Sequence, residues 1–329
     1  MSSGRTVLGI DTSNYKTSLA LVADGKTICD IRRLLTVKEG ERGLRQSEAL
    51  VQHIVNLPEL FRQLRETADI VPDAIACSVR PRPVEGSYMP CFLPGKSQAE
   101  SMALAMGIPL VEFSHQEGHI EAIRKSGRLE KDEFLACHFS GGTCEILKAL
   151  KTARGYDIEI TGGTKDISYG QVLDRAGVAM GYAFPCGEEL DRLALKAEAE
   201  GKSASDILTP VKVKDGCVNL SGFESQIQRV IAGRIMNGGD SDDPDREKFV
   251  GEIFRRMSAS ISEMIMQNAR RTGIDDVIMS GGVSASVFIR RRIEDRLKRE
   301  GIRLHFGDST LSSDNAVGIA YLGERVLWD

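Results

Sequence analysis

Two histidines four residues apart are the residues in this sequence best suited to chemistry. His115 and His119 lie in the segment His-Gln-Glu-Gly-His, directly after an apolar run that ends near Phe113. If this segment opens a helix, positions i and i+4 face the same side, and both imidazoles can reach one metal ion. The chain has only five histidines, which favours a metal site. The alternative is an exposed pair that binds nothing.

The spacing of this motif argues against a zinc peptidase. Such enzymes place a glutamate directly after the first histidine, where it serves as general base. Here Gln116 holds that position, and Glu117 is turned by roughly 100 degrees around the helix. We therefore interpret the pair as a metal site without peptidase activity.

A carboxylate far along the chain has two interpretations. Asp314 stands in the polar turn Ser-Ser-Asp-Asn before the last helical pattern, residues 315–327. By itself this placement predicts an N-cap, because an aspartate side chain satisfies the unpaired amides of a helix start. A role as third metal ligand is the alternative.

Two paired-glycine turns follow apolar strand patterns. They are Ser140-Gly141-Gly142 and Ser280-Gly281-Gly282. Glycine lets backbone amides approach a phosphate or a nucleoside closely, although one such turn alone is weak evidence. Together with the turn that begins at Asp11, they predict a nucleotide held between two lobes.

The elements that position these residues form a repeated pattern. Strand patterns at 6–11 and 17–22 flank a polar turn, and 134–139 and 144–147 repeat the same unit. Amphipathic helices follow at 47–64 and 246–270. A strand-helix-strand unit spans 74–113, and we expect its helix to begin at Ser97, because Ser97 and Glu100 have capping-box spacing. A strand at 276–280 leads into a helix through Leu297 and a strand at 303–306.

Length and composition limit the classes of protein to which this chain can belong. A chain of 329 residues exceeds the usual size of one core, so two domains are expected. The chain has 43 Lys and Arg residues against 47 Asp and Glu residues. Its overall charge therefore provides no positive field that would attract nucleic acid. Seven cysteines without a CxxC pair or a secretory leader predict reduced thiols in the cytosol. No apolar run reaches the roughly 20 residues that a membrane helix needs.

In this order, the motifs resemble those of the threonylcarbamoyl transferases that modify tRNA adenosine, once labelled O-sialoglycoprotein endopeptidases. The matching segments are 9–13, 115–119, 140–142, 170–187, 281–283 and 314–316. The resemblance spans nearly the whole chain. It implies an α/β fold of two actin-like lobes, as in actin, sugar kinases and heat-shock proteins, with duplicated sheets and a cleft between them. Residues 1–130 with 311–329 would form the first lobe, and 131–310 the second.

The resemblance also implies site residues, cofactors and partners. The metal ligands, for iron or zinc, would be His115, His119, Asp314 and His138. The nucleotide, ATP or an acyl-adenylate, would contact His138, Phe139, Ser140, Gly141, Gly142, Asp174, Gly187, Asp191, Gly281, Gly282 and Ser286. Asp11 and Lys16 would be catalytic, and magnesium would be a further ion. Partners would be tRNA and either proteins of the threonylcarbamoylation system or a second copy, in the cytoplasm and without a membrane.

The chain departs from this family at several positions. Asn14, Tyr15 and Lys16 stand where the family has acidic residues in the first turn, and residues 80–83 replace a Gly-Pro-Gly segment. The expected reaction is transfer of threonylcarbamoyl from its adenylate to tRNA adenosine. Because of these departures, the alternative is a diverged paralogue that performs another carbamoyl transfer or ATP hydrolysis, or a nucleotide-binding scaffold without catalysis.

Overall fold

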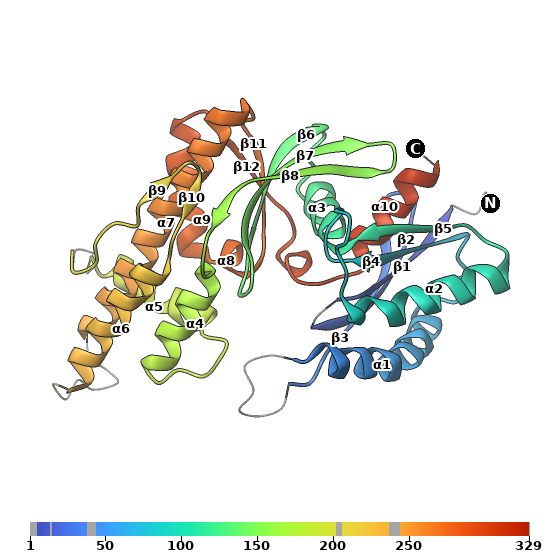
Figure 1. Ribbon diagram of the computed structural model, residues 1–329, viewed down its shortest axis with the longest axis horizontal. Helices are drawn as coiled ribbons and strands as arrows, with labels where there is room; N and C mark the ends of the chain where they lie inside the picture. Colours follow the sequence, from blue (N-terminus) through green and yellow to red (C-terminus); the bar gives the residue numbers. More distant parts are fainter. Residues whose placement is uncertain (1–4, 14, 38–43, 202–205, 237–243, 329) are drawn as a thin grey trace. The chain divides into compact units, whose positions relative to one another are not determined.

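The computed structural model describes residues 5–13, 15–37, 44–201, 206–236 and 244–328 (Figure 1). Asn14 of the first turn therefore lies outside the described residues. Contacts group the chain into two compact units. The first comprises Met1–Glu130, Leu150–Asp157 and Gly307–Asp329, and the second Lys131–Ala149 and Ile158–Phe306. The expected lobe boundaries, at 130/131 and 310/311, stay a prediction.

A five-stranded sheet forms the centre of the first unit, in the order β3-β2-β1-β4-β5. Its strands are β1 (Thr6–Thr12), β2 (Lys16–Ala23), β3 (Lys26–Leu34), β4 (Ala74–Arg80) and β5 (Leu110–Ser114). β1 and β2 are antiparallel, with Thr12 opposite Thr17, which confirms the predicted strand, turn and return strand. β1, β4 and β5 run parallel, so their carboxyl ends lie at one edge.

Helices cover both faces of this sheet (Figure 1). They are α1 (Gln46–Thr67), α2 (Leu93–Met106), α3 (His115–Ser126) and α10 (Val317–Trp328), with short 3-10 turns at Pro90–Phe92 and Ser309–Leu311. Side chains alternate along β1, so neighbouring residues face opposite helices. A Cβ on Gly9 would lie 2.5 Å from the carbonyl oxygen of Ala316 before α10, whereas Ile10 packs with Leu57 and Leu60 of α1. Gly9 thus allows α10 to approach the sheet closely.

The helix between β4 and β5 begins earlier than the sequence predicted. α2 starts at Leu93, and Ser97 lies inside it instead of capping it. Pro94 falls in the first turn of the helix, where amide hydrogens have no partner within the helix and a missing one costs little. The predicted capping box at Ser97 is therefore wrong.

A seven-stranded sheet runs through the second unit in the order β12-β11-β6-β7-β8-β10-β9. Its strands are β6 (Glu133–Phe139), β7 (Cys144–Thr152), β8 (Gly155–Thr164), β9 (Val213–Lys214), β10 (Cys217–Val218), β11 (Asp276–Ser280) and β12 (Arg303–Phe306). The tip of the β7-β8 hairpin belongs by its contacts to the first unit.

Six helices accompany this sheet among the described residues. They are α4 (Tyr169–Ala179), α5 (Gly187–Ala199), α6 (Ser221–Met236), α7 (Pro244–Thr272), α8 (Gly282–Ala285) and α9 (Val287–Arg299). The predicted stripe of α7 is buried, with Ile253, Phe254 and Met257 fully enclosed. The single helix expected between 282 and 297 is instead broken at Ser286, whose hydroxyl accepts a hydrogen bond from the amide of Ile289 and caps α9.

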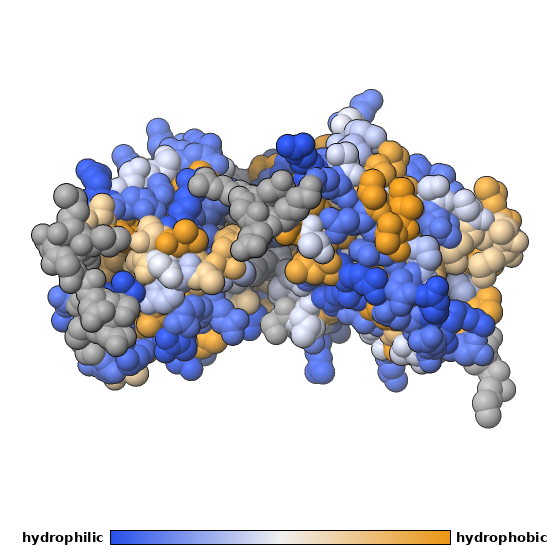
Figure 2. Space-filling model, turned by 90° about the horizontal axis from the view of Figure 1, so that it is seen from below, coloured by the Kyte–Doolittle hydropathy of each residue, from blue (hydrophilic) through white to orange (hydrophobic). Residues whose placement is uncertain are grey.

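The surface is mostly hydrophilic on the face shown in Figure 2, with scattered hydrophobic residues. α1 contributes exposed Val51, Ile54 and Val55. None of the described helices is long and apolar enough to cross a membrane. The seven cysteines are all unpaired, and six of them are buried.

Candidate metal and nucleotide sites

Three parallel strands bring the first group of polar residues to one edge of the five-stranded sheet. Asp11 follows Ile10, which is paired with Cys77. Ser78 comes next in β4 and is paired with Phe113 of β5, two residues before His115. The carboxyl ends of parallel strands therefore place Asp11, Ser78 and His115 side by side.

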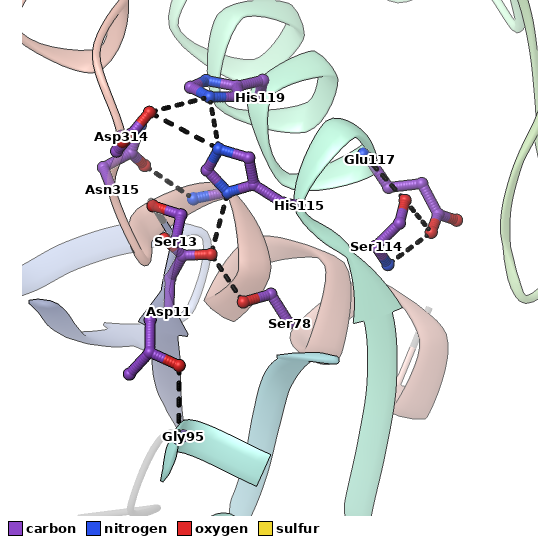
Figure 3. A network of polar contacts seen from close by, with 12 residues as sticks. Asp11, Ser13, Ser78, Gly95, Ser114, His115, Glu117, His119, Asp314 and Asn315 are labelled. Atoms are coloured by element: carbon purple, nitrogen blue, oxygen red, sulfur yellow. Dashed lines mark hydrogen bonds and ion pairs between the residues drawn. The ribbon is translucent and has the colours of Figure 1, made fainter. Parts of the chain in front are cut away.

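His115 stands at the centre of a chain of polar contacts (Figure 3). Its Nδ1 lies 2.9 Å from Oδ1 of Asp11, which also accepts a 2.5 Å hydrogen bond from the Ser78 hydroxyl. On the opposite side of the ring, its Nε2 lies 2.9 Å from Nε2 of His119. Oδ1 of Asp314 lies 3.4 Å from both of these Nε2 atoms. The structure thus brings together an aspartate and a histidine pair that lie far apart in the sequence.

A capping box sets the start of the helix that carries both histidines. The Ser114 hydroxyl accepts from the amide of Glu117, and the Glu117 carboxylate accepts from the Ser114 amide and hydroxyl. The other oxygen of Glu117 accepts from the amide of Tyr156 at 3.1 Å. Both carboxylate oxygens are engaged, so Glu117 is not free to act as the general base of a peptidase.

Asp314 does not serve as the helix cap that its position alone predicted. The neighbouring Asn315 takes that role, since its side-chain oxygen accepts from the amide of Gly318. Its amide group donates to the carbonyls of Leu311 and Ser313, which holds the turn in shape. Asp314 is thereby left to face the two imidazoles.

The charges of the cluster are coupled. Burial opposes the charge of Asp11, but the adjacent His115 outweighs it and lowers the pKa of that carboxyl. Burial also opposes a charged His115, yet Asp11 and Asp314 raise its pKa to about 10. Burial and the charge of His115 lower the pKa of His119. Partial burial also opposes the charge of Asp314, but hydrogen bonds from both imidazoles hold its pKa well below the usual value. The two carboxylates therefore favour a proton on His115 over one on His119.

The donor set fits a divalent transition metal. One ligand atom from each of His115, His119 and Asp314 lies within 4.8 Å of the others. Two imidazoles and one carboxylate suit zinc and ferrous iron, which leave further positions for substrate. Asp11 accepts from Nδ1 of His115, an arrangement that orients Nε2 toward a metal. Among the described residues, buried Oδ2 of Asp11 and Oγ of Ser13 have no hydrogen-bond partner.

The two glycine turns lie next to each other in the second unit. They follow β6 and β11, which are parallel neighbours with His138 opposite Ser280. Gly281 has φ of +89°, and a Cβ there would lie 2.3 Å from the carbonyl oxygen of Phe139. Only glycine allows this approach. By contrast, a Cβ on Gly141, Gly142 or Gly282 would meet nothing within 4 Å, so this backbone is open to a ligand.

Hydrogen bonds inside the second unit hold the first glycine turn. The Ser140 hydroxyl accepts from the amide of Thr143 at 3.0 Å, and the Ser168 hydroxyl donates to the carbonyl of Gly141 at 2.6 Å. A Cβ on Gly170 would lie 2.5 Å from Cα of Gly141, so α4 packs directly against the turn. The turn is therefore a fixed surface.

The remaining residues expected to contact nucleotide have structural partners. The carboxylate of Asp191 accepts from the Ser286 hydroxyl at 2.5 Å and from two amides at the start of α9. Asp174 accepts from the amide of Cys186, and burial raises the pKa of its carboxyl. Gly187 begins α5 with open space at its Cβ position. Asp191 thus joins α5 to the turn that carries Ser286.

Two further expected residues are not members of the three-residue cluster or of the glycine turns. Lys16 opens β2, and its Nζ donates to the Ser313 hydroxyl at 2.7 Å, one residue before Asp314. His138 lies in the second unit and is not part of the three-residue cluster found among the described residues. Its role as a fourth metal ligand stays a prediction.

Sequence analysis missed residues that support the first turn. Ser78 was not among the expected site residues, although a hydroxyl at the carboxyl end of a parallel strand is a recognisable signal. His53 is fully buried in α1, where Nε2 lies 2.8 Å from the carbonyl of Ser13 and Nδ1 lies 2.8 Å from the Thr17 hydroxyl. The carbonyl requires Nε2 to be the donor. A histidine on the apolar side of an amphipathic helix was the available signal.

Comparison with known proteins identifies similar sequences. Residues 35–321 match the family described as tRNA N6-adenosine threonylcarbamoyltransferase. The chain is 26% identical to the protein of that name from Neorickettsia sennetsu, over 96% of this chain and 92% of that protein. It is 28% identical to one from Thermus thermophilus, over 97% of this chain and 92% of that protein.

Solved structures show the same fold at low identity. Full-length HypF, in a phosphate- and nucleotide-bound form, is similar with a TM-score of 0.61 and 13% identity, over all of this chain and 48% of HypF. Component A of the (R)-2-hydroxyglutaryl-CoA dehydratase of Acidaminococcus fermentans is similar with a TM-score of 0.53 and 14% identity, over 98% of this chain and 99% of that protein. The predicted α/β fold of the actin-like type is confirmed, whereas the expected cleft between lobes stays a prediction.

Proposed function

Because this chain belongs to the tRNA N6-adenosine threonylcarbamoyltransferase family, we propose that it transfers a threonylcarbamoyl group from its adenylate to N6 of adenosine in tRNA. The observation that carries the proposal is the cluster of His115, His119 and Asp314, backed by Asp11, within a chain that matches this family over residues 35–321. In this reaction N6 forms a bond to the carbamoyl carbon, the bond from that carbon to the phosphate oxygen breaks, and the amine loses a proton.

Iron or zinc would be held by His115, His119 and Asp314, with His138 as a candidate fourth ligand. When bound, such an ion supplies Lewis acidity and neutralises phosphate charge. The residues of the chain do the remaining work. Asp11 accepts the Nδ1 proton of His115 and fixes that ring, and Ser78 in turn fixes Asp11. The contacts of Asp11 suit a positioning role, although the resemblance implied a catalytic one.

The nucleotide of the donor, ATP or an acyl-adenylate, would lie on the glycine turns of the second unit. Space is open at the Cβ positions of Gly141, Gly142 and Gly282, so a phosphate or ribose would approach the fixed backbone of the turns from that side. Asp174 and Gly187 would border the ribose. Asp191 would act through Ser286 and the start of α9, since its carboxylate already accepts three hydrogen bonds. Magnesium would accompany the nucleotide phosphates.

The partners and location follow from the reaction. tRNA is the acceptor, and a net charge of -4 means that its affinity depends on local basic surface or on partner proteins of the threonylcarbamoylation system. A second copy of the chain is the other candidate partner. We place the protein in the cytoplasm, where tRNA is modified.

The alternative activities are less well supported. Another carbamoyl transfer, ATP hydrolysis or a scaffold role was inferred from the altered first turn, but the family match covers residues 35–321 and all three cluster residues lie within it. Peptidase activity is disfavoured, because Glu117 caps its own helix.

Mass spectrometry of tRNA nucleosides tests the proposal. Purified protein, unmodified tRNA and threonylcarbamoyl-adenylate should yield the modified adenosine, with partner proteins added in a parallel reaction. His119→Ala should reduce the yield about 100-fold or more, because it removes a ligand from the cluster. His305→Ala is the matched control, since His305 pairs with Asp276 in the second unit and should leave the yield unchanged. No product from the wild type in either reaction would refute the transfer.

A further inference from the structure

A lysine lies at the same edge as the imidazole-carboxylate cluster. Lys16 opens β2 opposite Leu34, and Arg32 lies two residues before Leu34 in β3. Residues two apart on a strand share a face, so Lys16 and Arg32 point to the same side. Both reach the Ser313 hydroxyl, at 2.7 Å from Nζ of Lys16 and 3.5 Å from Nη1 of Arg32. Ser313 directly precedes Asp314.

The two cations differ in how far their charge is compensated. Arg32 donates Nε and Nη2 to the carboxylate of Asp30 and Nη1 to the carbonyl of Thr310. The ammonium of Lys16 has three hydrogens, and among the described residues only the Ser313 hydroxyl accepts one. Burial lowers the pKa of Lys16, and Asp314 offsets that effect only in part. Lys16 is therefore a half-buried cation with unused donors.

The nearby carboxylates are already engaged. Oδ1 of Asp11 accepts from His115 and Ser78, and Asp314 faces both imidazoles. A divalent ion on the cluster would balance these two carboxylates and leave the charge of Lys16 in excess. An added anionic group beside Ser313 would therefore be favoured, because it pairs with a partly desolvated cation.

We infer that Lys16, held by Ser313, forms a recognition position for an oxyanion of the substrate, the carboxylate of the acyl group or the phosphate of the leaving group. The inference rests on the proposed function for the identity of that substrate. Lys16 would then select substrates that carry an anion at this edge, and would bind that anion without taking part in bond making.

Calorimetry on the full chain with small probes tests this role without tRNA modification. N-acetyl-L-threonine represents the carboxylate, N-acetyl-L-threonine amide is its neutral counterpart, and inorganic phosphate represents the leaving group. Lys16→Gln should weaken the binding of one or both anionic probes about tenfold and leave the amide unchanged, since one charge-assisted hydrogen bond is lost. The probe that responds identifies the source of the anion.

Two variants keep the test independent of folding. Arg33→Gln makes the same kind of charge change on the opposite face of β3 and should bind every probe as the wild type does. Lys16→Arg keeps the charge and should retain affinity within about threefold. The inference is overturned if Lys16→Gln binds both anions normally, if it loses the amide equally, or if Arg33→Gln shows the same loss. If the protein does not modify tRNA but still binds the anionic probes through Lys16, the proposed reaction is refuted and the inference about Lys16 stands.

Discussion

Protonation at single residues decides what the cluster can bind. Asp11 accepts the Nδ1 proton of His115 and so turns Nε2 of that ring toward Asp314, which Nε2 of His119 also faces. Spacing alone predicted the histidine pair. Position alone favoured Asp314 as a helix cap and left the ligand role as the alternative, which the family resemblance then implied. That Asn315 caps instead depends on the folded turn, which no local pattern encodes.

Replacing the carboxylate behind His115 tests this arrangement. Asp11→Asn keeps the size of the side chain but removes the charge that holds the Nδ1 proton, so we expect zinc affinity to fall about 10- to 100-fold. Chelator competition measures the dissociation constant. Asp275→Asn, at an exposed ion pair with Arg303, is the control and should bind zinc normally. Equal zinc affinity in the two variants would show that Asp11 does not orient His115 as a metal ligand.

The open glycine of the second turn provides a test of the nucleotide site. Gly282→Glu should fill the space beside the turn and repel phosphate, so we expect affinity for an ATP analogue to fall about tenfold or more. Gly222→Glu adds the same side chain in α6, where a Cβ likewise meets nothing within 4 Å, and should leave affinity unchanged. Calorimetry compares the two. Wild-type affinity in Gly282→Glu would place the nucleotide elsewhere.

At the scale of elements, a buried network fixes α3 and with it both histidines. Glu121 forms a bidentate ion pair with Arg124 and accepts from the Tyr156 hydroxyl. Arg325 of α10 donates to the carbonyls of Thr152 and Gly155 in the β7-β8 hairpin. α3 is thereby tied to two segments that lie far from it in sequence.

Neutralising Glu121 should destabilise the first unit in a pH-dependent way. Burial opposes its charge, but Arg124, Tyr156 and Arg325 lower its pKa overall. Its contribution is therefore present above the unfolded pKa of about 4.3 and is lost as pH falls further. Glu121→Gln should lower the free energy of unfolding by about 3 kcal/mol at pH 7, because Arg124 loses its buried partner. The loss of unfolding free energy caused by Glu121→Gln should become smaller below pH 4.

Urea denaturation at several pH values measures that difference. Glu59→Gln in α1 removes an exposed partner of Arg62 and should change the free energy of unfolding by less than about 1 kcal/mol. A deficit in Glu121→Gln that stays constant from pH 7 down to well below pH 4 would contradict the assignment of a depressed pKa.

Most elements were predictable from the sequence, and the failures have local causes. Strand alternation and the apolar stripes of α1 and α7 reflect burial and therefore appear in the pattern itself. The predicted helix start at Ser97 was wrong because Pro94, which precedes the apparent capping box at Ser97, favours an earlier start of α2. The break at Ser286 depends on Asp191 in another helix, and tertiary partners leave no trace in a local window.

At the scale of the molecule, the two candidate sites belong to different units. The metal cluster lies in the first unit, and the glycine turns lie in the second. The single tryptophan, Trp328, ends α10 in the first unit and stacks against the guanidinium of Arg5. Its fluorescence therefore reports the first unit, whereas circular dichroism reports helices of both.

These two signals should respond differently to the two ligands. Zinc at 100 times its dissociation constant adds about 2.7 kcal/mol to the unit that binds it, which corresponds to a rise of roughly 5 to 11 °C in the midpoint of a unit of this size. We expect zinc to raise the tryptophan-monitored midpoint, and an ATP analogue to raise a component of the circular dichroism melt that tryptophan does not follow. Chelation should reverse only the zinc effect, and the Asp11→Asn variant should lose much of it while keeping the nucleotide effect. If both ligands move both signals by the same amount, the units unfold as one cooperative body, and the assignment of one site to each must be tested by direct binding instead.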